Sequence, residues 1–282
     1  MSEGPQLMRP TWFVGCGNMG GSIIEGWRSG GIDLGPVTVV RPSGKPVDGT
    51  RTVTKFAEAG PPPRLVVLAF KPQKLDEIAP QLRTWLTSKT VVVSLLAGVE
   101  VASLRQRFPG AGTIVRAMTN LPVAIRRGVS ALYSADADER TKQQLGDLFA
   151  ALGFAMWAVD EARLAAIGSV AGAGPAYVAR FIAALAKAGE KRGLSSEIAA
   201  TIAVETVLGT SWMAATRGED MESIARRVAS PKGTTQAGLA VLDHDHVLDQ
   251  LIALTIDAAA RRGAELAEEA KSASLAEPAR LS

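Results

Sequence analysis

A glycine-rich segment near the N-terminus carries the residue types best suited to chemistry. Residues 15–20 read Gly-Cys-Gly-Asn-Met-Gly directly after the apolar run 11–14. Where such a segment joins a strand to a helix, Gly15 permits the tight turn, Gly17 lets the backbone approach a pyrophosphate, and Gly20 lets the helix pack on the strand. The free N–H groups at the start of that helix attract phosphates. The segment therefore predicts a dinucleotide-binding turn rather than a purely structural one, made by Gly15, Gly17, Asn18, Met19 and Gly20.

The end of the second apolar run, 37–40, bears on which dinucleotide binds. An enzyme that uses NAD usually places Asp or Glu there to bind the ribose 2′-hydroxyl. Here Arg41 follows the run, and a guanidinium attracts the 2′-phosphate that a carboxylate would repel. We therefore expect NADPH as the cofactor, with NADH as the alternative. A merely solvated Arg41 is the competing interpretation.

Two later loops are expected to line the same cleft, because ligands of such sheets sit beyond the carboxyl ends of the strands. The run 64–70 leads into Lys-Pro-Gln, and the run 90–94 leads into Leu-Leu-Ala-Gly. Small residues in these loops would let the backbone approach a ligand, although plain connecting turns would look the same. The cofactor contacts expected from these loops are Ala69, Lys71, Ala97 and Gly98.

The elements that must position these loops alternate in type. Up to residue 159, short runs rich in Val, Ile and Leu alternate with helix-length segments, which favours an α/β fold with a doubly wound, mostly parallel sheet. After that the strand signals stop and Ala-rich helical periodicity takes over. We expect two domains, 1–160 and 161–282. The expected strands are 11–14, 37–40, 64–70, 90–94, 113–116, 128–133 and 154–159.

The second half is expected to be all helical. Ser195 is a plausible N-cap, a short helix is expected near 220–228, and the last helix is expected to begin near His246 and to fray from about Lys271. This half has about 110 residues and carries much apolar surface for that size, which favours homo-oligomerisation through it. His244 and His246 lie between helices with no further ligand cluster nearby, so we expect a solvated turn and no metal.

Composition narrows the functional class. The 282 residues carry a net charge of +3 with no Lys/Arg run, so we expect no nucleic-acid partner. The apolar runs fall short of the ~18 residues of a membrane span, and the N-terminus lacks an apolar signal region. The chain has 1 cysteine, which allows no internal disulfide and fits a cytoplasmic protein.

Three more segments point to one family. Residues 116–122 read Arg-Ala-Met-Thr-Asn-Leu-Pro, 171–177 read Ala-Gly-Ala-Gly-Pro-Ala-Tyr, and 230–235 read Ser-Pro-Lys-Gly-Thr-Thr. Together with the glycine turn and Leu-Ala-Phe-Lys-Pro-Gln at 68–73, they resemble, in order, pyrroline-5-carboxylate reductase. The resemblance implies a Rossmann-like NAD(P)H-binding domain, a helical dimerisation domain often assembled further, and an oxidoreductase that reduces the C=N bond of 1-pyrroline-5-carboxylate in the last step of proline biosynthesis.

The resemblance also implies roles for single residues. Gly233, Thr234 and Thr235 would bind the substrate carboxylate through backbone N–H and hydroxyl groups. Thr235 would also hydrogen-bond the ring nitrogen, as the catalytic residue. Asn120 would help hold the nicotinamide end of the cofactor, which Ala97 and Gly98 would line. A protonated cyclic imine already accepts a hydride readily, so positioning and a polar partner for the nitrogen would suffice.

Three departures from the family pattern keep alternatives open. Ala171 and Ala173 replace serines, and Lys232 replaces a glycine, which leaves room for an NADPH-dependent reductase of another cyclic imine. A non-catalytic NADPH-binding dimer is a further alternative. A β-hydroxyacid dehydrogenase would carry a proton-transferring Lys where this chain has Val178, and valine cannot serve.

Overall fold

The computed structural model describes residues 4–35 and 37–275. By its contacts the chain divides into two compact units, Met1–Ala173 together with Ala259–Ser282, and Gly174–Ala258. The domain boundary expected at residue 160 marks the point where strand patterns give way to helical ones. The two units are instead defined by which residues contact one another. Each unit is described by itself.

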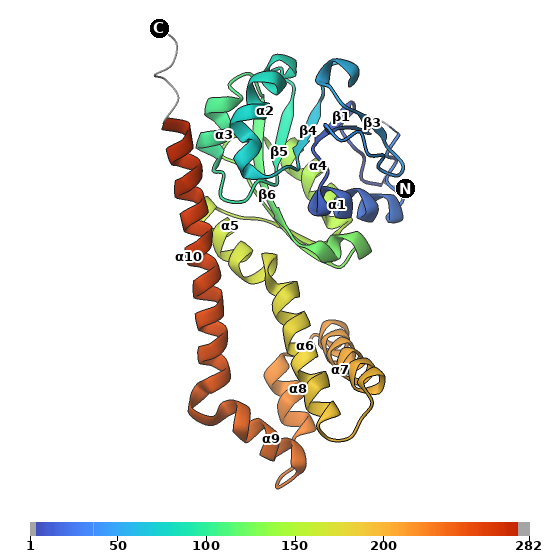
Figure 1. The fold of residues 1–282 in the computed structure, drawn as a ribbon, viewed down its shortest axis with the longest axis vertical. Helices are drawn as coiled ribbons and strands as arrows, with labels where there is room; N and C mark the ends of the chain where they lie inside the picture. The colour runs from blue at the N-terminus through green and yellow to red at the C-terminus, as the bar shows by residue number, and fades with distance from the viewer. Residues whose placement is uncertain (1–3, 36, 276–282) are drawn as a thin grey trace. The chain divides into compact units, whose positions relative to one another are not determined.

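The first unit alternates strands and helices along the chain (Figure 1). Its strands are β1 (Thr11–Val14), β2 (Val37–Val40), β3 (Arg51–Val53), β4 (Leu65–Leu68), β5 (Val91–Ser94), β6 (Thr113–Thr119), β7 (Gly128–Tyr133) and β8 (Gly153–Trp157). Its helices are α1 (Asn18–Ser29), α2 (Leu75–Leu82), α3 (Val101–Arg107), α4 (Glu139–Ala150) and α5 (Glu161–Ile167), and a π-helical turn, Gly168–Gly172, follows α5.

The described strands form one eight-stranded sheet in the order β3-β2-β1-β4-β5-β6-β7-β8. Every neighbouring pair is parallel except β6 with β7. The doubly wound, mostly parallel sheet expected from the sequence is therefore confirmed. Strand β3 was not among the expected strands, because this edge strand has three residues and buries only Val53 among them.

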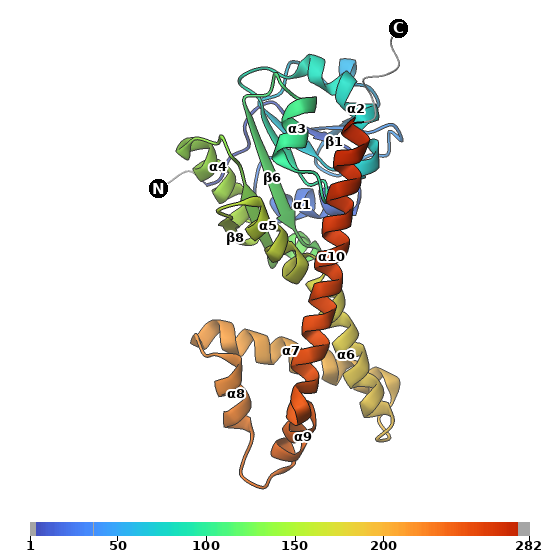
Figure 2. The same ribbon diagram turned by 90° about the vertical axis from the view of Figure 1, so that its left-hand side faces the viewer.

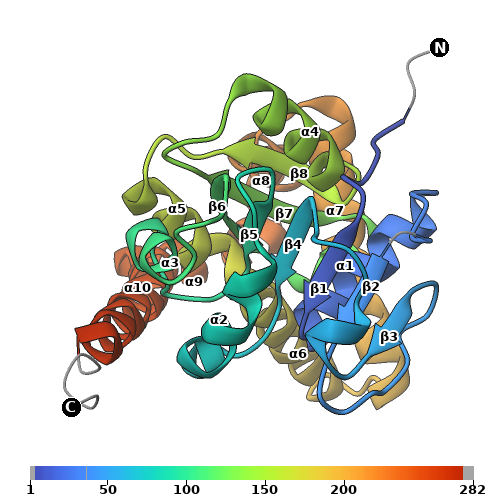
Figure 3. The same ribbon diagram turned by 90° about the horizontal axis from the view of Figure 1, so that it is seen from above.

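Helices cover both faces of the sheet (Figure 3). Side chains of β1 pack alternately against the helices of one face and of the other. Phe13 points to the face covered by α1 and α4, where Trp27 packs edge-on against it at 5.8 Å. Trp12 points to the face covered by α2 and α3 and packs with Trp85 at 5.7 Å. Because both faces are covered, β1, β2, β4 and β5 are buried along their whole length.

The carboxyl ends of four strands lie in one row. Val14 of β1 pairs with Val40 of β2 and with Leu68 of β4, which in turn pairs with Ser94 of β5. The loops that begin at residues 15, 41, 69 and 95 therefore leave the sheet at the same edge. The order of the strands reverses between β1 and β4, which is where such sheets bind ligands.

The second unit is built from helices joined by short turns. They are α6 (Gly174–Glu190), α7 (Ser196–Arg217), α8 (Met221–Val228) and α9 (Thr234–Asp243), followed by α10 (Val247–Leu275), which begins in this unit and ends in the first (Figure 2). Ser195 caps α7 by accepting the N–H of Ile198, as expected, and Asp220 caps α8. The expected fraying from Lys271 is wrong as far as Leu275, since α10 continues to that residue; residues 276–282 lie outside the described part.

The helices of the second unit leave much apolar surface uncovered. Phe181, Ile202 and Trp212 are each about half exposed, at 51%, 50% and 52%. By length and composition alone, Glu161–Glu190 and Ser196–Arg217 could even cross a membrane, although charged residues interrupt both. Exposed apolar side chains in such number mark an interaction surface.

Candidate functional site

Two glycines of the N-terminal turn are required by close packing against the end of β4. Gly15 has φ of 76°, and a Cβ on it would lie 2.8 Å from the carbonyl oxygen of Ala69. A Cβ on Gly20 would lie 2.9 Å from the Cβ of Ala69. Ala69, itself 9% exposed, is thus the surface against which the turn and α1 are fitted.

Gly17 differs, because no other segment lies close to the position that its side chain would take. It is the N-cap of α1, and a Cβ on it would meet no atom within 4 Å. No side chain caps α1, and no acid lies in its first turn. The free N–H groups and the positive end of the helix dipole therefore face an open space, which is the arrangement that holds a phosphate.

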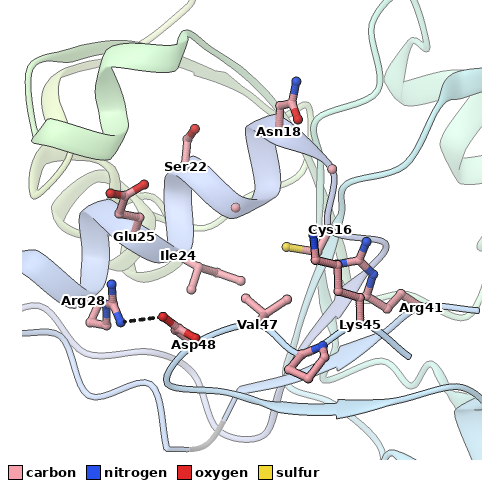
Figure 4. Close-up of a pocket in the computed structure, with 13 residues that line it drawn as sticks. Cys16, Asn18, Ser22, Ile24, Glu25, Arg28, Arg41, Lys45, Val47 and Asp48 are labelled. Atoms are coloured by element: carbon pink, nitrogen blue, oxygen red, sulfur yellow. Dashed lines mark hydrogen bonds and ion pairs between the residues drawn. The ribbon is translucent and has the colours of Figure 1, made fainter. Parts of the chain in front are cut away.

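That open space is a cavity of about 740 Å³ between α1 and the loop after β2 (Figure 4). Arg41 and Lys45 approach it from the loop, and Gly17 and Asn18 approach it from the start of α1. Two cations on one wall and a helix N-terminus on the other suit a ligand with two separated anionic groups. The lining residues are Cys16, Gly17, Asn18, Gly21, Ser22, Ile24, Glu25, Arg28, Arg41, Lys45, Pro46, Val47 and Asp48.

Two backbone hydrogen bonds and one ion pair fix the walls of this cavity. The N–H of Gly15 donates to the carbonyl of Val40 at 2.8 Å, and the N–H of Arg41 donates to the carbonyl of Val53 at 3.0 Å. At the far end, Arg28 of α1 pairs with Asp48 of the loop, with 3.4 Å between Nη1 and Oδ2 (Figure 4). The hydrogen bond from Gly15 to Val40 ties the glycine turn to the end of β2. It therefore fixes the N-terminus of α1 relative to Arg41.

Cys16 lies on the cavity wall beside Arg41. Burial raises the pKa of its thiol above the ordinary value, and the nearby Arg41 charge partly opposes this by lowering it. The thiol is therefore protonated at neutral pH, which suits a filler residue better than a nucleophile.

The remaining residues expected to contact the cofactor lie outside the cavity lining. Met19 packs against the core, Lys71 is exposed at the start of a 3-10 turn, and Ala97 is exposed at the tip of the loop after β5. Gly98 follows with φ of 75°. A Cβ on Gly98 would lie 2.9 Å from the backbone carbon of Leu266 in α10, so the close approach here is made by the chain itself.

Asn120 uses both ends of its amide within the protein. Its Nδ2 donates to the carbonyl of Ala171 at 2.9 Å, and its Oδ1 accepts the N–H of Val129 at 2.8 Å. The side chain, 6% exposed, thereby ties the end of β6 to the π-helical turn before α6. This arrangement favours a bracing role, with one amide hydrogen left for a ligand.

The segment expected to bind substrate forms a tight turn before α9 in the second unit. The N–H of Gly233 donates to the carbonyl of Ser230 at 3.0 Å, and Lys232 at the third position of the turn has φ of 58°. Such a turn favours Pro second and Gly third. Gly233 is the N-cap of α9 with no side-chain cap, so Thr234 and Thr235 occupy its first turn.

Several residues near these sites were not expected from the sequence. Lys45 follows Arg41 by four positions in the same loop, a spacing that could have suggested a second cation. Glu161 accepts the N–H of Val101 at the start of α3, which no local pattern reveals. In the described part of the chain, no three His, Cys, Asp or Glu side chains are grouped to hold a metal ion.

Comparison with known proteins finds similarity over both halves of the chain. A family model described as pyrroline-5-carboxylate reductase dimerisation matches residues 161–266, and one described as NADP oxidoreductase, coenzyme F420-dependent, matches residues 12–98. The chain is 35% identical to the pyrroline-5-carboxylate reductase of Pseudomonas aeruginosa, over 91% of this chain and 96% of that one. The dimerisation model covers α5 to α9 and much of α10, and it supports assembly of the chain as a homo-oligomer.

Solved structures extend the similarity to the fold. The chain is 29% identical to a pyrroline-5-carboxylate reductase from Coxiella burnetii, with a TM-score of 0.83 over 92% of this chain and 99% of that one. It also shares its fold with a Plasmodium falciparum pyrroline carboxylate reductase with NADP bound, with a TM-score of 0.83 at 23% identity over 94% and 100% of the two chains.

Proposed function

The chain belongs to the pyrroline-5-carboxylate reductase family, and on that premise we propose that it reduces 1-pyrroline-5-carboxylate to L-proline as an NAD(P)H-dependent oxidoreductase acting on a C=N bond. The observation that carries the proposal is the identity of 35% over 91% of the chain, which spans both the sheet and the helical part. Bound NADPH would supply the hydride.

The cavity beside α1 supports NADPH as the cofactor. The uncapped first turn of α1 at Gly17 would bind the pyrophosphate through backbone N–H groups. Arg41 and Lys45 would bind the 2′-phosphate, Arg41 through a bidentate contact and Lys45 as a point charge. No carboxylate takes the place of Arg41 at the end of β2, so nothing there would select NADH.

The turn before α9 would hold the substrate. The Gly233 N–H already donates to the Ser230 carbonyl, so the N–H groups suited to the carboxylate of the imine acid are those of Thr234 and Thr235 in the uncapped first turn of α9. The Thr235 hydroxyl can donate or accept, so it can stay bonded to the ring nitrogen as the imine becomes an amine. An already protonated imine needs no strong acid, and positioning by these groups accounts for the remaining catalysis.

The helical part would assemble as a dimer or a larger homo-oligomer. Covering side chains such as Phe181 and Trp212 with a second copy removes apolar area from water at about 25 cal/mol per Å². The same covering would account for the two long apolar helices without a membrane. A cytoplasmic location is part of the proposal and is supported by the single unpaired Cys16.

A second candidate function is the reduction of another cyclic imine acid. Lys232 favours it, since a lysine with φ of 58° stands in a turn where glycine would be unstrained. The ammonium would add a positive charge beside the carboxylate-binding N–H groups, and so favour a substrate with more negative charge.

The test measures the oxidation of NADPH through the loss of its absorbance. The substrates are 1-pyrroline-5-carboxylate and a panel of other cyclic imine acids. NADH is run in parallel. Rapid turnover of 1-pyrroline-5-carboxylate with NADPH is the expected result. Faster turnover of another imine would make that imine the substrate. Tight NADPH binding without any turnover would instead indicate a non-catalytic NADPH-binding dimer.

A further inference from the structure

The loop 95–100, which joins β5 to α3, is most exposed at its tip, Ala97. Leu96 and Val99 are buried, at 3% and 0% exposed, and the N–H of Val99 donates to the carbonyl of Leu96 at 3.4 Å. Ala97 and Gly98 form the tip, at the sheet edge where the strand order places a ligand. The position of the tip therefore depends on how the two ends of the loop are held.

Glu161, the first residue of α5, holds the far end of this loop. Its Oε1 accepts the N–H of Val101 at 2.7 Å, and Val101 is the first residue of α3. Glu100, the N-cap residue, makes no capping bond with its side chain, so the cap comes from Glu161 instead. A carboxylate at this end of a helix is stabilised by the free N–H groups and the helix dipole.

Arg116 of β6 holds the other oxygen of the same carboxylate. Its Nη1 lies 3.4 Å from Oε2 of Glu161, and the two side chains are only 13% and 24% exposed. Arg116 pairs in register with Ser94, the last residue of β5. Because partly buried charges are little screened by salt, this pair fixes the start of α3 relative to the strand from which the loop departs.

The tip of the loop also lies against Leu266 and Ala267 of α10, a helix that runs beside α3 (Figures 1 and 3). A Cβ on Gly98 would lie 2.9 Å from the backbone carbon of Leu266 and 3.0 Å from the nitrogen of Ala267. The match to the dimerisation family model runs from residue 161 to residue 266. Glu161, the first residue of this dimerisation region, therefore contacts the start of α3. Leu266, its last residue, lies against Gly98 in the loop 95–100.

We propose that Glu161 is a positioning residue for the nicotinamide end of the cofactor site, and that through it the dimerisation region sets the loop tip at Ala97 and Gly98. The inference rests on the proposed function for one point, that the nicotinamide meets this tip. The glycine turn and Arg41 hold the opposite end of the dinucleotide, so the two ends can be tested separately.

The test compares three variants, namely Glu161→Gln, Glu161→Ala and the matched control Glu139→Gln. Glu139 is the first residue of α4 behind an Asp N-cap, as Glu161 is in α5, but its carboxylate pairs with Lys142 on the surface. Each protein is titrated with NADPH and with adenosine 2′,5′-bisphosphate, which has the adenosine half and the 2′-phosphate but no nicotinamide. Melting temperature and the isotope effect of 4-deuterated NADPH are measured alongside.

We expect Glu161→Ala to weaken NADPH binding about tenfold and to leave the Kd of the bisphosphate unchanged. Glu161→Gln keeps an oxygen for the Val101 N–H but loses the charge facing Arg116, so its effect should be intermediate, and it carries the test if the alanine variant does not fold. A misplaced nicotinamide slows hydride transfer, which should raise the isotope effect. The control should match the parent protein in every measurement.

Equal loss of both ligands, or a lower melting temperature with both affinities unchanged, would overturn the inference, because Glu161 would then be purely structural. Failure of the proposed function gives a different pattern. A parent protein that does not reduce 1-pyrroline-5-carboxylate, with variants that lose NADPH but not the bisphosphate, would refute the substrate and support the positioning role.

Discussion

Gly17 and Gly20 stand three positions apart in one turn, yet they should respond to the same substitution in opposite ways. At Gly17 a Cβ meets no atom within 4 Å, and the backbone has φ of −82° and ψ of −162°, which valine adopts freely. The folding cost of Gly17→Val is therefore the loss of a favoured N-cap residue, about 1 kcal/mol. At Gly20 a Cβ would lie 2.9 Å from that of Ala69, so Gly20→Val overpacks the contact of helix and strand and costs about 3 kcal/mol.

For cofactor affinity the two variants should rank the other way. Gly17→Val should weaken NADPH binding more than Gly20→Val does. The valine side chain at position 17 would occupy the space into which the first N–H groups of α1 point. Losing one or two charge-assisted hydrogen bonds to a phosphate costs about 3 kcal/mol, which weakens NADPH binding about 100-fold. Gly20→Val, where it folds, leaves those N–H groups exposed, so its affinity loss should be small beside its loss of stability.

The assay measures both quantities on each variant. Calorimetry gives the melting temperature without ligand, and fluorescence titration gives the Kd of NADPH. Gly17→Val should melt within about 4 °C of the parent protein, since 1 kcal/mol moves a chain of this size by about 2–4 °C. A Gly17→Val protein that folds and binds NADPH as well as the parent would refute the placement of the phosphate at this helix.

Three further predictions concern the cavity and the substrate turn. Arg41→Glu should weaken NADPH binding about 100-fold, since a carboxylate replaces a charge-assisted partner of the 2′-phosphate, and should barely change NADH binding; equal losses measured by titration would remove that assignment. Lys232→Gly should raise the melting temperature, because it relieves about 1 kcal/mol of strain at a φ of 58°, whereas a lower value would show that the lysine makes a stabilising contact. The Cys16 thiol, whose pKa burial raises, should react slowly with iodoacetamide at neutral pH and faster as the pH rises and the thiolate forms. NADPH should protect Cys16 from this reaction, and fast labelling at neutral pH, detected by mass spectrometry, would contradict the raised pKa of the thiol.

The sequence was sufficient where a local pattern decides the structure. The strands β1 and β2 were located to the residue, because a strand buried on both faces leaves a nearly continuous apolar run. Ser195 was recognised as an N-cap because its side chain satisfies a backbone group only three residues away. The edge strand β3 gave no such signal, since its residues are mostly exposed.

Contacts between distant segments were beyond sequence reasoning. The smallness of Gly98 was correctly noticed, but whether a ligand or another helix approaches it depends on where α10 ends in space. Asn120 was expected at the cofactor, and only the fold shows its amide committed to Val129 and Ala171. Glu161 caps a helix that begins 60 positions earlier in the chain, so no periodicity could have assigned it.

The central claim is that this chain transfers a hydride from NADPH to the C=N carbon of 1-pyrroline-5-carboxylate. The most direct measurement is mass spectrometry of the product formed with NADPH deuterated at the transferred position. The account predicts L-proline heavier by one deuterium, bound to the ring carbon that was double-bonded to nitrogen. Unlabelled proline, or no proline despite NADPH binding, would contradict it.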